Sequence, residues 1–193
     1  MPLSPRSPVG SSAATVRHAR GWALASAALA MGLIAGFFYA YACSVMIGLA
    51  RVDDHTFIDA MQWINATVRN QWFAPSFFGA LALTLLAVLL HLPRGGRPVL
   101  LWAAAALVLY AAAFGITMGV NVPLNEDLAA VGDPALLADA AAVRAAFEDR
   151  WVTWNVVRAV AATVALACLL RALVLHGMTS RPRPLAGGPG ASL

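Results

Sequence analysis

The chain has 193 residues, of which 61% are hydrophobic and only 11% charged, and its formal net charge is +4. Soluble domains carry about 25% charged residues, so this composition excludes an ordinary soluble domain and predicts a membrane protein. The 13 basic residues are all arginine and form no cluster with aromatic residues between them, which argues against nucleic-acid binding.

Four apolar stretches follow the N-terminal segment. A transmembrane helix needs about 20 predominantly apolar residues, and the expected spans cover about residues 22–49, 72–92, 99–120 and 151–176. They predict an all-α fold, an integral membrane four-helix bundle over residues 22–176. The flanking segments are rich in proline, glycine and serine, which predicts disordered tails at residues 1–21 and 177–193.

Charge is distributed unevenly around these spans. The N-terminal tail, the short turn at residues 93–98 and the C-terminal end hold arginines and no acidic residue. All nine acidic residues lie in the two long connections and the adjoining helix start. Because arginine-rich segments stay on the cytoplasmic side, we expect a multi-pass protein of the cell (inner) membrane with both termini in the cytoplasm.

Both long connections show helical signals. In residues 53–70, apolar side chains recur at helical spacing after an acidic start, at Phe57, Met61, Ile64 and Val68. In the second connection, Asp133 and Pro134 are typical of a helix start, and helix-forming residues continue from Ala135 into the fourth span. We therefore expect additional short helices in the two outer loops and a fourth helix that projects beyond the bilayer.

No metal site is predicted. The four histidines lie in different segments and are not expected to converge, and neither His-x3-His nor Cys-x2-Cys spacing occurs. No cofactor is predicted either. Asp53, Asp54 and His55 are the best-placed candidate bases, although a solvated acidic loop is the simpler interpretation of that segment.

Polar side chains gather where the spans meet the outer loops. Trp151, Trp154, Asn155 and Arg158 share one helical face, and Arg158 lies about two turns inside the fourth span. An arginine inside a span is costly and normally faces the bundle interior with a partner. Asn121 and Asn125 are the nearest candidates. Pro123 is expected to end the third helix, which would free backbone carbonyls to accept from Arg158.

Two interpretations of this polar set stay open. The first is a pocket that binds an apolar or anionic aromatic molecule, since tryptophans stack, asparagines orient and arginine stabilises negative charge. The second is an interfacial aromatic belt with a snorkelling arginine, which explains the tryptophans but not four asparagines at matching depth. The further candidate binding residues are Asn65, Asn70, Trp72 and Arg150.

Several short motifs together resemble a family of four-helix membrane proteins grouped with the fungal anthrone oxygenases. The resemblance covers about residues 24–172 and is carried by Asp53-Asp54-x-Thr-Phe57, Met61-Gln62-x-Ile-Asn65, Asn70-x-Trp72-Phe73, Asn121-Val-Pro-Leu-Asn125 and Arg150-Trp151-x2-Trp154-Asn155-x2-Arg158. It implies oxidation of an anthrone to an anthraquinone by O₂, with no evident metal or flavin.

The resemblance also implies roles for individual residues. Trp151 and Trp154 would bind the tricyclic substrate, while Asn121, Asn155 and Arg158 would stabilise its enolate oxygen. The base is left unassigned. Two alternatives stay open beside this oxidoreductase: a binding or transport protein for a small molecule, and an accessory subunit of a membrane complex. A homo-oligomer is possible in each case.

Overall fold

The computed structural model describes residues 9–92 and 97–179, and this part of the chain is helical with no strand. The elements, in chain order, are α1 (Val9–Ala40), the π-helical turn η1 (Tyr41–Val45), α2 (Met46–Leu49), α3 (Asp54–Thr67), α4 (Phe73–His91), α5 (Arg97–Ile116), the π-helical turn η2 (Thr117–Asn121), α6 (Val122–Ala130), the 3₁₀ turn η3 (Pro134–Leu136) and α7 (Ala140–Thr179). The predicted all-α bundle, with short helices in both outer loops, is confirmed.

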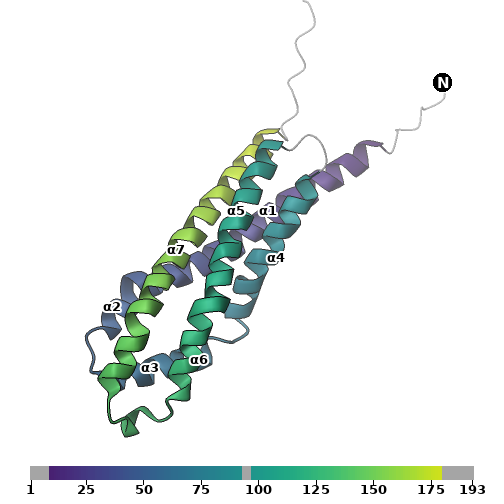
Figure 1. Cartoon of the computed structure of the whole chain (residues 1–193). Helices are drawn as coiled ribbons and strands as arrows, with labels where there is room; N and C mark the ends of the chain where they lie inside the picture. The colour runs from purple at the N-terminus through teal and green to yellow at the C-terminus, as the bar shows by residue number, and fades with distance from the viewer. Residues whose placement is uncertain (1–8, 93–96, 180–193) are drawn as a thin grey trace, which may run out of the picture.

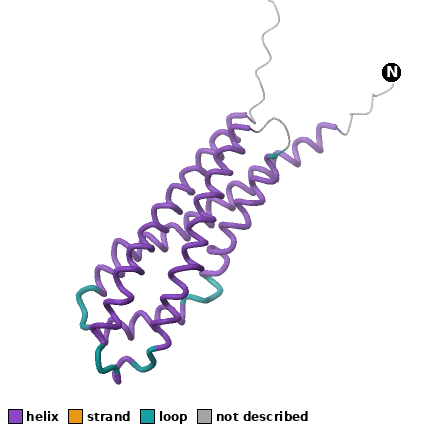
Figure 2. Tube along the Cα trace, in the orientation of Figure 1, coloured by secondary structure: helices purple, strands orange, loops and turns teal. Residues whose placement is uncertain are grey.

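The long helices form an elongated bundle (Figure 1). In it α1 packs against α4 and α7, and α5 packs against α4 and α7. The described chain begins and ends at one end of the bundle, which we call the terminal end. The connections that carry α3, α6 and η3 lie at the other, which we call the capped end (Figure 2). Four helical segments are long and apolar enough to cross a bilayer, so the protein is a multi-pass membrane protein. Which end faces the cytoplasm stays a prediction.

The first helix is longer than expected. It begins at Val9, so residues 9–21, predicted to be part of a disordered tail, are helical. Alanines at positions 13, 14 and 19 favour this extension, because alanine is the strongest helix former. At the other end of the chain, α7 continues through Thr179. The rest of both predicted tails, and most of the predicted turn at 93–98, lie outside the described residues.

The third span does not end at Pro123, as the sequence had suggested. The helix widens at η2, where the backbone amide of Val122 donates to the carbonyl of Thr117, and then continues as α6. Pro123 lies in the first turn of α6. The missing amide hydrogen of proline is tolerated in a first turn, so the chain stays helical. Single π-helical turns of this kind are frequent at functional sites.

The second long connection is interrupted before the fourth span. Asp133 caps η3, and residues 137–139 are not helical. The continuous helix therefore starts at Ala140, where Asp139 Oδ1 accepts from the amide of Ala142 at 3.0 Å. The prediction of an unbroken helix from Ala135 was wrong. α7 nevertheless has 40 residues, about twice the number that a bilayer requires, so its predicted projection is confirmed.

Arg144 fixes the first long connection to α7. Its guanidinium donates to the carbonyls of Val52 and Leu49, at 2.9 and 3.4 Å, and lies 4.4 Å from the centre of the Phe57 ring. It also forms ion pairs with Asp54 at 3.0 Å and with Glu148 at 2.6 Å. One side chain thus ties the end of the first span and the start of α3 to the fourth helix.

The start of α3 is set by Asp53. Its carboxylate accepts from the amide of Thr56 at 3.0 Å and from the Thr56 hydroxyl at 2.6 Å, which makes it the N-cap. These hydrogen bonds lower the pKa of Asp53 below its ordinary value. At its far side α3 is tied to the second connection, because the Gln62 amide donates to the carbonyls of Leu128 and Gly132. α3 therefore lies fixed across the capped end of the bundle.

Candidate functional site

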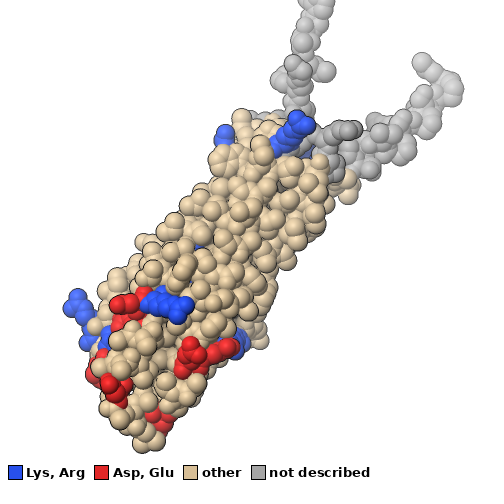
Figure 3. Space-filling view, in the orientation of Figure 1, with Lys and Arg blue, Asp and Glu red and all other residues tan. Residues whose placement is uncertain are grey.

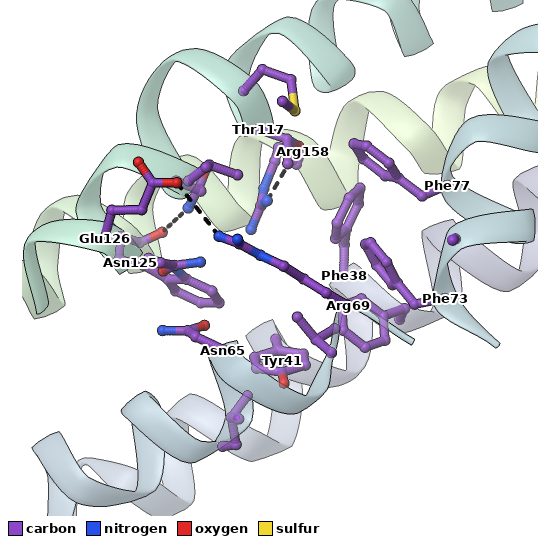
Figure 4. Close-up of a pocket in the computed structure, with 18 of the residues that line it drawn as sticks. Phe38, Tyr41, Asn65, Arg69, Phe73, Phe77, Thr117, Asn125, Glu126 and Arg158 are labelled. Carbon is purple, nitrogen blue, oxygen red and sulfur yellow. Dashed lines mark hydrogen bonds and ion pairs between the residues drawn. The ribbon is translucent and has the colours of Figure 1, made fainter. Parts of the chain in front are cut away.

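A cavity of about 420 Å³ lies in the bundle near its capped end. It is enclosed by the end of α1, the end of α3, the start of α4, the η2–α6 segment and α7. Small-molecule pockets in proteins usually measure about 300–1,000 Å³. The cavity is therefore large enough for a ligand of a few fused rings. Figure 4 shows its aromatic lining largely on one side and Asn125 and Glu126 on the other.

Aromatic rings from α1, η1, α4 and α7 form the apolar wall. Phe73 stacks on Phe77 with ring centres 5.2 Å apart, and Phe37 lies 5.1 Å from Phe73. Tyr41 and Trp151 meet at 5.6 Å. Flat side chains in contact with one another leave flat surfaces toward the cavity, which suits a planar aromatic ligand.

Arg158 is buried at the deep end of this wall, with 4% of its surface exposed. It donates to Thr117 Oγ1 at 3.2 Å and to Asn155 Oδ1 at 2.9 Å, and its guanidinium lies 4.5 Å from the centre of the Phe38 ring. No carboxylate in the described part of the chain pairs with it. Its neighbours are neutral, so its positive charge is available to an anionic group in the cavity.

Three buried polar atoms around the cavity have no hydrogen-bond partner within the described residues: Arg158 Nε, Asn121 Oδ1 and Asn65 Nδ2. All three side chains line the cavity. A buried polar atom without a partner costs about 1–3 kcal/mol, so such atoms are rare outside functional sites. Two donors and one acceptor thus stay unpaired in side chains around one aromatic cavity, which suits a ligand with polar oxygens at its edge.

The asparagines do not bind Arg158 in the way the sequence had suggested. Asn121 Nδ2 donates to the carbonyl of Trp151 at 3.3 Å, and Asn125 Oδ1 accepts from the Trp151 indole at 2.8 Å. The hydrogen-bond partners of Arg158 are instead Thr117 and Asn155. The physical reason is η2, because its wider turn places the Thr117 hydroxyl, rather than freed carbonyls, beside the guanidinium.

Arg69 and Glu126 lie together at the edge of the cavity. Their charged groups are 3.6 Å apart, and each side chain is 63% exposed. Arg69 comes from the connection between α3 and α4, and Glu126 comes from α6 (Figure 4). Among the described residues that line the cavity, Glu126 is the one carboxylate.

The structure brings together half of the predicted site. Five predicted residues line the cavity: Asn65, Asn121, Asn125, Trp151 and Arg158. Asn155 lies behind Arg158, where its amide nitrogen donates to the carbonyl of Phe38 at 3.1 Å.

Besides Asn155, four more predicted residues lie outside the lining: Trp154, Asn70, Trp72 and Arg150. Asn70 caps the start of α4, since its side-chain oxygen accepts from the amides of Trp72 and Phe73. Trp72 is 81% exposed and lies where an interfacial belt residue would. Arg150 is exposed and Trp154 half-buried beside the helix face that carries Arg158.

Sequence reasoning missed the lining residues from α1 and α4, and also Thr117, Arg69 and Glu126. The spacing of Phe73 and Phe77 by four residues, next to Phe37 and Phe38 at the matching end of the first span, is a usable signal. It places aromatic rings at the same depth as the asparagines. The pairing of Arg69 with Glu126 has no comparable sequence signal.

The candidate bases of the first loop are engaged elsewhere. Asp53 caps α3, Asp54 pairs with Arg144, and His55 Nδ1 lies 2.7 Å from the carbonyl of Pro134. None of the three lines the cavity. The simpler interpretation of that segment, a polar loop with structural contacts, describes these side chains better than a catalytic role does.

The prediction that the histidines do not converge was wrong for one pair. At the terminal end, His91 Nε2 lies 3.5 Å from His176 Nδ1, and the two rings are nearly perpendicular. His91 is buried, and its Nδ1 lies 2.7 Å from the carbonyl of Ala87. Even so, the described residues contain no group of three or more His, Cys, Asp or Glu side chains arranged to hold a metal.

Fold and site define a class: a small multi-pass membrane protein whose four-helix bundle holds an aromatic cavity with a buried arginine. The family described as anthrone oxygenase matches residues 63–168, more than half of the chain. The chain therefore belongs to the anthrone oxygenase family, as its motifs had indicated. The matched region includes Asn65, Asn121, Trp151 and Arg158. No curated protein and no solved structure matches significantly.

Proposed function

We propose that this protein is an oxidoreductase that uses O₂ to oxidise an enolisable aromatic molecule of the anthrone type. The observation that carries the proposal is Arg158, a buried cation that lines an aromatic cavity and has no carboxylate partner among the described residues. Such a cation stabilises an enolate, in which negative charge has moved onto the carbonyl oxygen. Membership of the anthrone oxygenase family supports the same reaction type.

The reaction can be followed through the residues of the cavity. The planar substrate packs against Phe73, Phe77 and Trp151, with its carbonyl oxygen directed to Arg158. Loss of a proton from the ring CH₂ group gives a delocalised enolate. Its carbon then reacts with O₂ to form a peroxide anion, which takes up one proton to become a hydroperoxide, and the hydroperoxide loses water to give the ketone. The balance is one CH₂ group and one O₂ converted to one C=O group and one H₂O, with no external reductant.

Glu126 is the base in this proposal. A proton acceptor must reach the substrate, and Glu126 is the carboxylate among the described lining residues. It pairs with Arg69 at 3.6 Å in a largely exposed position, where an ion pair is worth little. The substrate can therefore displace Arg69 from it at small cost. After proton transfer, solvent at the exposed edge of the cavity can take the proton away.

The proposal is tested by O₂ uptake of the detergent-purified protein with an anthrone as substrate. We expect uptake well above the spontaneous rate, with one anthraquinone formed per O₂ consumed. We also expect it to survive a metal chelator, because no step above uses a cofactor. Uptake no faster than in buffer alone would remove anthrones as substrates, and uptake abolished by the chelator would overturn the cofactor-free mechanism.

Glu126→Gln should lower the rate of O₂ uptake by about 100-fold or more, the usual contribution of a positioned general base. Glutamine keeps the size and a polar group but cannot accept the proton. Binding of an anthraquinone, measured by titration, should persist because it needs no proton transfer. The matched control is Asp127→Asn on the next residue, which is exposed and does not line this cavity. Equal rates in both variants would exclude Glu126 as the base.

The alternatives are less well supported. A structural accessory subunit has no need of a ligand-sized cavity with unpaired polar atoms. Transport requires a path across the membrane, whereas side chains fill the described core between the cavity and the terminal end, among them Met31, Ile34, Tyr110 and Leu169. A site closed at its deep end favours chemistry on a bound molecule. Homo-oligomer formation stays a prediction.

A further inference from the structure

Phe78 and Met118 belong to the cavity and to the outer surface of the bundle at once. Both line the cavity, yet 55% of Phe78 and 48% of Met118 is exposed. Phe78 lies on α4 and Met118 lies on η2, so the two side chains border the seam between the second and third spans. These two side chains therefore lie between the cavity and the surroundings of the bundle.

The seam lies at the depth of the lipid hydrocarbon. Trp72 is 81% exposed at the start of α4, as is typical of residues at the membrane interface. Phe78 follows six residues later, about 9 Å deeper at the rise of an α-helix. The face seen in Figure 3 carries its charged side chains toward the two ends, with an uncharged surface between them. Phe78 and Met118 therefore face lipid tails.

The seam can also open without rebuilding the bundle. Gly115 at the end of α5 and Gly119 on η2 lie near Met118 in the chain, and an added Cβ at either position would meet nothing within 4 Å. Methionine is unbranched and flexible, so Met118 can change rotamer into this uncrowded space. The edge of the cavity toward the capped end differs, because Arg69 and Glu126 stand there 3.6 Å apart. Both of these charged side chains are 63% exposed, so this edge faces water rather than lipid.

Building on the proposed function, we propose that the substrate enters from the lipid bilayer, between Phe78 on α4 and Met118 on η2. The substrate class is then a lipid-soluble aromatic that is uncharged while it is in the membrane. An enolisable ketone meets this requirement, because its neutral form dissolves in hydrocarbon and it becomes an anion only beside Arg158. The ion pair of Arg69 and Glu126 faces water and serves proton exchange rather than substrate entry.

The test blocks the seam after the protein has folded. In a background with Cys43→Ser and Cys168→Ala, Met118→Cys is labelled with a bulky lipid-soluble maleimide, and the protein is placed in lipid nanodiscs. Binding of 1-hydroxyanthraquinone is followed by stopped-flow fluorescence. We expect the label to slow association by about tenfold or more. The control is Val108→Cys with the same label, a residue that is 70% exposed on α5 and does not line the cavity, and its association rate should be unchanged.

Two outcomes would overturn entry from the bilayer. One is an unchanged association rate with the label at position 118. The other is equal association rates for 1-hydroxyanthraquinone and for anthraquinone-2-sulfonate, whose charge keeps it in water. In both cases the unlabelled protein still binds the probe, so the proposed function survives while the route fails. Failure of the unlabelled protein to bind 1-hydroxyanthraquinone would count against the cavity as the site, and thus against both proposals.

Discussion

Replacing Arg158 by glutamine should lower the rate of O₂ uptake with an anthrone by about 100- to 1,000-fold, the usual cost of removing one preorganised oxyanion donor. Glutamine keeps a polar, hydrogen-bonding group but is shorter than arginine, so the hydrogen bonds to Thr117 and Asn155 are weakened as well. What is lost is the buried positive charge that stabilises the enolate. The effect should therefore appear in kcat more than in the binding of an anthraquinone.

The matched control is Arg150→Gln, the same substitution on the same helix. Arg150 is exposed and lies outside the cavity, so its variant should retain the wild-type rate. Asn155→Leu gives a second comparison, since it removes the side chain that accepts from Arg158 without touching the cavity itself. It should also lower the rate. An Arg158→Gln variant that folds and turns over at the wild-type rate would contradict the assigned role of this arginine.

Arg144→Met should destabilise the folded protein by about 2–3 kcal/mol, the cost of removing charge-assisted hydrogen bonds and leaving their partners unpaired. Methionine keeps the length of the side chain but cannot donate to the carbonyls of Leu49 and Val52 or pair with Asp54 and Glu148. The side chain is only 14% exposed, so water replaces these partners poorly. The loss is measured by unfolding in mixed micelles with increasing sodium dodecyl sulfate.

Arg51→Met is the control for this measurement, because Arg51 is an exposed arginine in the same connection. Its variant should unfold at nearly the wild-type detergent fraction. Since α3 contributes Asn65 to the cavity, Arg144→Met should also weaken binding of an anthraquinone although it lies outside the site. Equal stability of the two variants would mean that α3 is held by its apolar contacts alone.

The sequence was sufficient for the fold, because each span shows as a long apolar stretch. The depth of each residue along its span was predictable for the same reason. Asn121, Asn125 and Trp151 line the same cavity as Arg158, since residues at equal distances from the ends of adjoining spans lie at one level. Rotation around each helix axis was harder to predict. Trp154 precedes Arg158 by four residues and so lies on the same side of the fourth helix, yet it does not line the cavity.

The errors share a physical origin in how helices meet. His91 and His176 end two spans at the same level, but their contact depends on α4 and α7 approaching across the bundle, which one sequence does not reveal. The hydrogen-bond partners of Arg158 depend on η2. A π-helical turn of five residues is too short to change the hydrophobic periodicity of a span, so the sequence does not predict it. Proline is common just beyond a helix end, so the sequence predicts an end at Pro123, whereas α6 accommodates this residue in its first turn.

The third span needs length and apolar side chains to insert into the membrane. The wide turn at η2 adds nothing to that and matters only for the site. A π-helical turn holds one residue more than an α-helical turn, so removing one residue from Thr117–Asn121 would restore ordinary winding and leave the residues beyond in nearly the same orientation. The span would keep its hydropathy, and Asn125 and Glu126 would still face the cavity. The change would fall on the turn itself, from which Thr117, Met118 and Asn121 now line the cavity. A chain with a single-residue deletion here would insert and fold as a bundle but present fewer side chains beside Arg158, so a relative's aligned length through this segment indicates whether it keeps this part of the site.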